Sequence, residues 1–155
     1  MTEKDEFDLY VFRISPDINQ QSGLSPSVKS NALYSISFTI NKANAILSFS
    51  NEVQRSMNTR NAVGYEIYFS KELLDEEAIR LSGKLELFKP ELPMMFLVSR
   101  HQEWRVKEVF ECLLDESTKT DLYRNEMMRT LIHVLILFSR RLVICETFDK
   151  SFKQS

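Results

Sequence analysis

The sequence predicts an α+β fold, with a small antiparallel β-sheet or partial barrel followed by an antiparallel hairpin of two helices. The clearest strand signal is Leu33–Ile40, in which apolar and polar residues alternate. Two helical apolar patterns follow Ser99, and a short link joins them. Helices joined by so short a link must pack antiparallel, and a β-rich half that precedes them indicates the α+β class.

The expected strands take up most of the first half of the chain. In Leu33–Ile40, the side chains of Tyr34, Ile36, Phe38 and Ile40 share one face. Ser35, Ser37 and Thr39 share the other face, which lies in solvent or lines a cavity. β-branched and aromatic content predicts the remaining strands at 6–14, 45–49, 62–69 and 94–98. Prolines and small polar residues make 15–31 a loop, and Ser70 is expected to cap a short helix that ends at Leu74 or extends through 75–83.

The second half of the chain is expected to be helical. Ser99 and Gln102 have the spacing of a capping box. One buried stripe then follows at Val106, Val109, Phe110, Leu113 and Leu114, with Lys107, Glu108, Glu111 and Asp115 facing water. Thr118 or Thr120 is expected to cap a second helix, which runs to about Glu146 and leaves 147–155 as a flexible tail.

The second helix carries the most informative pattern in the chain. Six residues from Met128 to Cys145 are spaced 3, 4, 3, 4 and 3 apart, which is the seam of a helix that packs along another helix. Ile132, Val134, Ile136 and Leu137 extend the apolar surface around the helix, so it needs cover on all sides. We therefore expect a homodimer with interface residues Met128, Leu131, Leu135, Phe138 and Leu142. In the competing interpretation, the seam packs only against the first helix of the same chain.

Composition favours a globular protein of one domain with a core of its own. The 155 residues are 43% apolar and 27% charged, and the net charge is −2. Lysine and arginine are scattered, so the electrostatic pattern of a nucleic-acid-binding protein is missing and no direct nucleic-acid binding is expected. The acidic N-terminus and short apolar runs predict neither a signal peptide nor a membrane span. Cys112 and Cys145, which are far apart, fit a reduced, cytoplasmic protein.

The sequence contains no motif of a known catalytic or metal site, so we expect no catalytic residues, bound metal or cofactor. It has no glycine-rich phosphate loop, and neither CxxC nor HExxH occurs. The two histidines, His101 and His133, fall in helical patterns, where a solvated or packed role is expected. The acidic run 75–77 is expected to be solvated, and Trp104 to pack in the core or hairpin. Met94 and Met95 are expected to fill the core, with an adaptable pocket as the alternative.

Two segments resemble the sensor half of AraC-type transcriptional regulators, in the form found in Bacteroidetes. Residues 41–57, NKANAILSFSNEVQRSM, resemble that family's strand and the turn after it. Residues 62–74, AVGYEIYFSKELL, resemble the Gly-Tyr strand that ends in a Phe-Ser turn into a helix. Residues 87–98 and the capped helix at Ser99 resemble the exit from the sensor barrel, and 120–143 resembles the linker helix, so the ordered likeness spans 34–143.

The sequence departs from this family in two places. Only Asn41–Asn44 joins two strands that normally flank a further hairpin, so the barrel is expected to be incomplete. The paired helix-turn-helix units that should follow the linker helix are expected to be missing, because the sequence ends at Ser155. The strand histidines of metal-binding cupin enzymes are also missing.

The resemblance implies a cupin-like sensor region at 1–98 and a helical linker and dimerisation hairpin at 99–146. The implied function is sensing of a small-molecule effector and dimerisation within an AraC-type regulator, truncated or standing alone. The candidate ligand pocket comprises Tyr34, Ile36, Phe38, Phe49, Tyr65 and Ile67, most of which also suit core packing. The alternatives are a small cupin-type enzyme, such as an isomerase or dioxygenase, and a degenerate fragment without ligand response.

Overall fold

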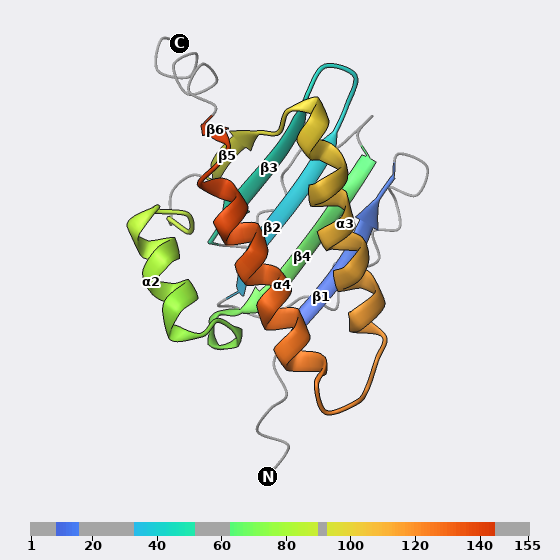
Figure 1. The fold of residues 1–155 in the computed structure, drawn as a ribbon, viewed down its shortest axis with the longest axis vertical. Coiled ribbons are helices and arrows are strands. Elements are labelled where there is room, and N and C mark those ends of the chain that lie inside the picture. Colours follow the sequence, from blue (N-terminus) through green and yellow to red (C-terminus); the bar gives the residue numbers. More distant parts are fainter. Residues whose placement is uncertain (1–8, 16–32, 52–62, 90–92, 145–155) are drawn as a thin grey trace.

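The computed structural model describes residues 9–15, 33–51, 63–89 and 93–144, which form one sheet and a layer of helices (Figure 1). The strands are β1 (Leu9–Ile14), β2 (Leu33–Ile40), β3 (Ala45–Ser50), β4 (Val63–Ser70), β5 (Met94–Leu97) and β6 (Val143–Ile144). The helices are the 3₁₀ turn η3 (Lys71–Leu73) and the α-helices α2 (Glu76–Lys84), α3 (Arg100–Ser117) and α4 (Arg124–Ser139). The predicted α+β class is confirmed.

All the described strands pair antiparallel in a single open sheet. Their order is β1-β4-β2-β3-β5-β6, so β1 and β6 are the two edges and the sheet does not close into a barrel. The β2–β3 hairpin turns through Asn41, whose side-chain oxygen accepts hydrogen bonds from the backbone N–H groups of Ala43 and Asn44 at 2.9 Å. The direct connection predicted at 41–44 is therefore confirmed.

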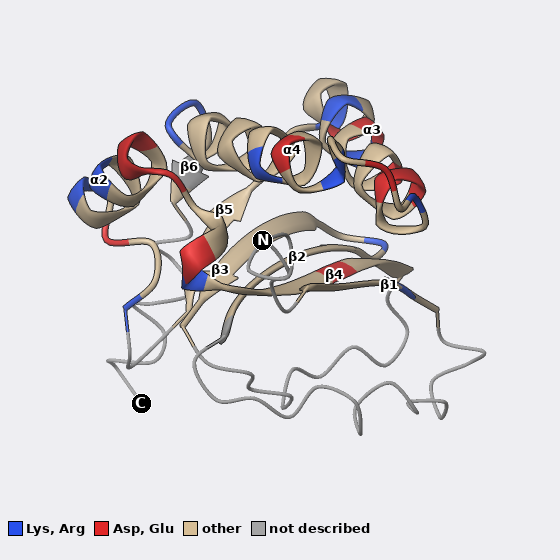
Figure 2. Ribbon diagram, turned by 90° about the horizontal axis from the view of Figure 1, so that it is seen from below, with Lys and Arg blue, Asp and Glu red and all other residues tan. Residues whose placement is uncertain are grey.

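Helices α2, α3 and α4 lie side by side on one face of the sheet, with α4 in the middle (Figure 2). The strand alternation explains which face they cover: Ile36 and Phe38 of β2 are fully buried beneath them. Phe110 of α3 stacks on Tyr65 and Phe38, with ring centroids 5.2 and 6.3 Å apart. Ser37 and Ser48 lie on the opposite face of β2 and β3, with hydroxyl oxygens 3.5 Å apart. Sheet and helices thus share one apolar core.

Gly64 allows the backbone of β4 to approach its neighbour β2 closely. Its φ is +155°, and a Cβ atom added there would lie 1.8 Å from the carbonyl oxygen of Phe38. No side chain fits at that distance, so the pairing of Gly64 with Thr39 requires glycine. The Gly-Tyr pair noted in the sequence therefore has a packing reason.

The helices differ from the sequence expectations at several boundaries. Asp75 begins α2 as a separate helix, because its carboxylate accepts a hydrogen bond from the Ala78 backbone N–H at 2.9 Å. Thr118 ends α3 and neither it nor Thr120 caps α4, which begins after Tyr123; both cap predictions were wrong. The expected end near Glu146 was also wrong. After Ser139 the chain tightens into i−3 hydrogen bonds, and β6 then pairs with β5.

None of the described helices is long and apolar enough to cross a bilayer. The predicted tail at 147–155 and Cys145 lie outside the described residues.

Candidate functional site

The six residues predicted to line a ligand pocket mostly form the core between sheet and helices. Ile36, Phe38, Phe49 and Ile67 have no exposed surface, and Tyr65 is nearly as buried. Tyr34 differs, because it lines a hollow of about 510 Å³ between β2 and α2. There its ring stacks on Phe88 at 4.1 Å, and the Lys71 ammonium lies 6.0 Å from it. Only Tyr34 of the six lies at an opening that a ligand could enter from the described surface.

The five residues predicted to form a subunit interface point in two directions. Met128 and Leu135 have no exposed surface and lie between α4 and the sheet, so they have no surface to offer a partner. Leu131, Phe138 and Leu142 are half-buried. Leu142 lies beyond the end of α4, in the turn that leads to β6. The predicted seam therefore holds α4 to its own chain at Met128 and Leu135, but through the core shared with the sheet and not only through the first helix, as the competing interpretation had it.

A second seam runs along the outer face of α4, and of its residues only Val134 and Leu137 were singled out in the sequence, as apolar surface that needs cover. We call this set of residues, Tyr123, Met127, Thr130, Val134, Leu137 and Arg141, the outer seam; their spacing is 4, 3, 4, 3 and 4. Tyr123 is the N-cap of α4 and Arg141 follows its C-cap, so these two residues flank the helix. Tyr123, Met127 and Leu137 are 66%, 43% and 46% exposed. Thr130 and Arg141 are exposed, and Val134 is half-buried. The helix therefore has one heptad stripe toward the sheet and another toward the outside.

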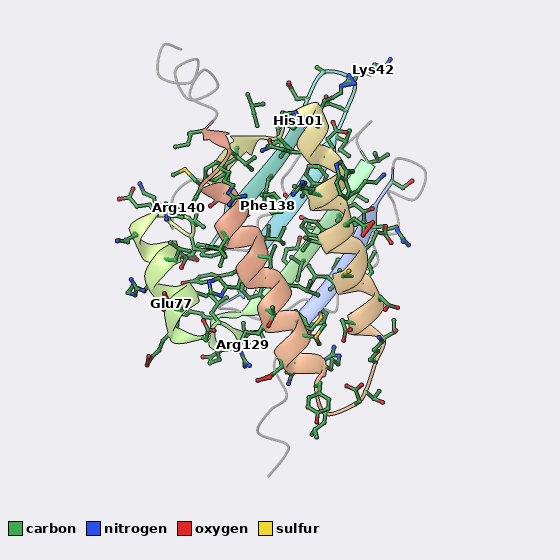
Figure 3. All side chains as sticks on the ribbon, viewed as in Figure 1. Lys42, Glu77, His101, Arg129, Phe138 and Arg140 are labelled. Carbon is green, nitrogen blue, oxygen red and sulfur yellow. The ribbon has the colours of Figure 1, made fainter. Side chains whose placement is uncertain are left out.

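Exposed apolar side chains are concentrated at this part of the molecule. The described residues expose nine large apolar side chains, and four of them lie on α4 or in the turn that leads into it: Leu122, Tyr123, Met127 and Leu137. Arg129, on the side of α4 toward α2, donates a hydrogen bond to the Leu73 carbonyl at 2.7 Å (Figure 3). That contact fixes the rotation of α4 about its axis, and so fixes which stripe faces outward.

Charge along the outer face of α4 is unevenly distributed. Glu126 lies in the first turn, next to Met127, and is exposed. Arg140 and Arg141 are exposed at the other end of the helix. A carboxylate therefore lies near the N-terminal end of the outer seam and two guanidinium groups near its C-terminal end, with Arg140 on the side toward α2 (Figure 3).

Tyr65, Glu111 and Arg13 form a polar cluster that joins β4, α3 and β1. The Tyr65 hydroxyl donates to Glu111 Oε2 at 2.6 Å, and Arg13 Nη2 donates to Glu111 Oε1 at 2.8 Å. Burial, followed by the hydrogen bond to Glu111, raises the pKa of Tyr65 to about 12. Tyr65 therefore stays protonated as a donor, and the cluster fastens α3 to the sheet. Glu111, predicted to face water, is partly exposed but also binds Tyr65 and Arg13.

A further hollow, of about 670 Å³, opens where the β2–β3 turn meets the first turn of α3 and the end of α4. Lys42, Arg100, His101 and Arg141 are among its lining residues. Figure 3 shows Lys42 and His101 at this same end of the molecule. Three segments far apart in the sequence supply these groups, so no local motif could have revealed them.

The remaining residues singled out in the sequence have structural positions. The capping box at Ser99 is confirmed: Gln102 Oε1 accepts from the Ser99 N–H at 3.2 Å and from its hydroxyl at 2.7 Å. Trp104 is 58% exposed, with the Arg105 guanidinium 5.2 Å from its ring centroid, so the prediction that it packs in the core or the hairpin was wrong. It lies across α3 from the buried Val106 and Phe110. Within the described residues, no three His, Cys, Asp or Glu side chains gather as a metal site.

Comparison with known proteins adds no relative: no protein-family model, curated protein or solved structure matches this chain.

Proposed function

We propose that this chain is an effector-sensing and dimerisation module of an AraC-type transcriptional regulator. The observation that carries the proposal is the outer seam of α4, a heptad stripe with exposed apolar side chains on a helix whose opposite face is already buried. The ordered resemblance of 34–143 to that family's sensor and linker helix supports it. The proposal gives residues 1–155 no direct contact with DNA, because their net charge is −2.

The partner that fits the outer seam is a second copy of α4 in antiparallel orientation. A two-fold axis at the level of Ile132 places Met127 against Leu137 of the partner and Thr130 against Val134 of the partner. The same axis places Tyr123 against Arg141 of the partner, which suits an aromatic ring and a guanidinium. An isologous contact of this kind closes as a dimer.

Charge also favours the antiparallel orientation over the parallel one. In the antiparallel pair, Glu126 lies across from Arg140 of the partner, and the pair occurs twice in the dimer. A parallel pair would instead place Arg141, which lies in the outer seam, beside its own copy. Like charges at that position destabilise a helix pair, whereas opposite charges determine orientation and register.

Sedimentation of purified variants tests the dimer. The wild type is expected to sediment as a dimer at tens of micromolar, and Leu137→Asp as a folded monomer, because a carboxylate in an apolar seam loses its hydration. Ile79→Asp is the matched control, since Ile79 is 51% exposed on α2, away from the outer seam. Leu135→Asp is expected to unfold the chain, because Leu135 is fully buried.

The same measurements can contradict the proposal. A wild type that sediments at about the 18.2 kDa of one chain across this range would exclude the dimer. A Leu137→Asp variant that stays dimeric would exclude the outer seam as its interface. Circular dichroism on each variant separates loss of association from loss of fold.

A further inference from the structure

The 670 Å³ hollow combines positive charge with an apolar floor. Lys42 comes from the β2–β3 turn, Arg100 from the first turn of α3, and Arg141 from the end of α4. None of the three forms an ion pair with any other described residue. Glu103 supplies one negative charge to the described lining against these three cationic side chains. The local field therefore favours an anion.

The floor of the hollow is made of aliphatic side chains. Ala45 and Val98 are buried there, and Ile40 and Leu142 are half-buried beside them. The volume falls within the range of small-molecule sites, which pair an apolar lining with a few polar groups that fix orientation. Inorganic ions would leave this floor unused, and a neutral apolar molecule would leave the cations without a partner.

We propose that this hollow binds an organic anion with an apolar body, whose acidic group meets Lys42, Arg100 and Arg141 and whose hydrocarbon part covers the aliphatic floor. The cationic side chains carry the attraction, because the capping box already occupies Ser99 and Gln102 at the helix end. Arginine and lysine contacts to a carboxylate are charge-assisted and therefore stronger than neutral hydrogen bonds.

Because of its position, the hollow is expected to regulate dimerisation. This regulatory role is the one part of the inference that rests on the proposed function. Arg141 belongs both to the hollow and to the outer seam of α4. An anion that binds Arg141 would change the charge at the end of the seam, and so would act on the dimer. Lys42 and Arg100 lie off the seam, which allows binding to be tested separately from dimerisation.

Calorimetric titration with octanoate, below the concentration at which it forms micelles, tests the proposal. Octanoate is expected to bind the wild type with one site per chain and to bind more weakly as salt is raised. In the double variant Lys42→Gln/Arg100→Gln, affinity is expected to fall about tenfold or more, as loss of charge-assisted contacts predicts. The control is Lys84→Gln, which removes one exposed cation from α2, outside the lining of the hollow.

Two further ligands separate the contributions of charge and apolar body. Acetate, which keeps the carboxylate, and 1-octanol, which keeps the chain, are each expected to bind far more weakly than octanoate. Equal binding of 1-octanol and octanoate would overturn the proposal, as would equal binding of acetate. So would a double variant that binds octanoate as the wild type does, or a wild type that shows no saturable binding.

The outcome can be distinguished from that of the dimer experiment. Leu137→Asp lies outside the lining of the hollow and is expected to keep saturable octanoate binding at one site per chain. If the anion acts on the dimer through Arg141, the affinity of this monomeric variant differs from that of the dimeric wild type by the same coupling. Binding to a chain that is always monomeric would retain the anion site and remove its proposed role in regulating a dimer. A wild type that dimerises but does not bind octanoate would retain the proposed dimer and exclude the anion site.

Discussion

The hydroxyl of Tyr65 donates a 2.6 Å hydrogen bond to Oε2 of Glu111, and this contact joins β4 of the sheet to α3. The two residues are 46 positions apart in the chain. Arg13 of β1 binds the other oxygen of the same carboxylate, so three elements meet at one side chain. Glu111 is itself partly exposed, with 44% of its side-chain surface accessible. The cluster therefore has a moderate effect on stability that can be measured.

Replacing Tyr65 by phenylalanine should lower the free energy of unfolding by about 1 kcal/mol, the usual net contribution of a hydrogen bond. The ring and its stacking on Phe110 are retained, so only the hydroxyl contact is lost. Tyr34→Phe is the matched control, because the Tyr34 hydroxyl has no hydrogen-bond partner among the described residues. Urea unfolding of the three proteins measures the difference, and equal midpoints for both variants would show that the contact contributes nothing.

The same cluster predicts loss of stability in alkali. The pKa of Tyr65 is raised from 10.0 to about 12, so the folded chain holds this proton more tightly than the unfolded chain. The stabilisation is fully present below about pH 10 and is lost as pH rises toward 12. Chemical unfolding at pH 8 and at pH 11 should show a smaller decrease for Tyr65→Phe than for the wild type. A decrease of the same size in both would assign the alkaline loss to other groups.

Acid should also weaken the cluster, because it protonates the carboxylate of Glu111. The hydrogen bond from Tyr65, with a further contribution from Arg13, lowers the pKa of Glu111 below its ordinary 4.5. Its contribution to stability is therefore present above about pH 4.5 and is lost as pH falls through the lower, folded-state pKa. Glu111→Gln removes this titrating group, so its unfolding free energy should fall less than that of the wild type between pH 6 and pH 3. A wild type without the steeper fall would contradict the prediction.

Gly64→Ala should be among the most damaging single changes in the described chain. The added Cβ would lie 1.8 Å from the Phe38 carbonyl oxygen, so β4 and β2 must move apart, at a cost of roughly 3 kcal/mol or more. Gly83→Ala is the matched control. No atom lies within 4 Å of a Cβ added there, and an alanine in α2 should stabilise the chain by about 0.5–1 kcal/mol. Thermal unfolding of both variants measures the difference in stability. A Gly64→Ala protein with the wild-type midpoint would contradict the close approach of β4 to β2.

Charge reversal tests the orientation of the proposed dimer. Glu126→Arg places like charges opposite Arg140 of the partner and should weaken association severalfold, as should Arg140→Glu. The double variant Glu126→Arg/Arg140→Glu restores opposite charges in an antiparallel dimer and should recover most of the affinity. Sedimentation equilibrium at low and high salt measures the three dissociation constants. Additive losses in the double variant would favour another orientation.

Local patterns identified most strands and helices because alternation and capping are local properties. The strand Leu33–Ile40 was predicted with the bounds that it has in the structure. The capping box at Ser99 was predicted with its partner, Gln102. The end of α4 was not predictable in this way. The sequence continues with apolar residues, but pairing of Val143 with Leu97 of β5 ends the helix at Ser139. That competition involves residues far apart in the chain.

The sequence by itself determined that this chain has a sheet followed by a helical hairpin, and that α4 is apolar nearly all round between Leu131 and Phe138. It did not determine what either heptad stripe of α4 would contact, because both stripes have heptad spacing and apolar residues at several positions. Tertiary contacts decided this: Met128, Ile132 and Leu135 fill the core, and Met127 and Leu137 remain outside. Tertiary structure also gathered Lys42, Arg100 and Arg141 around one hollow. The spacing of apolar residues specifies a face of one helix, whereas the packing of segments far apart in the sequence decides which surface that face contacts.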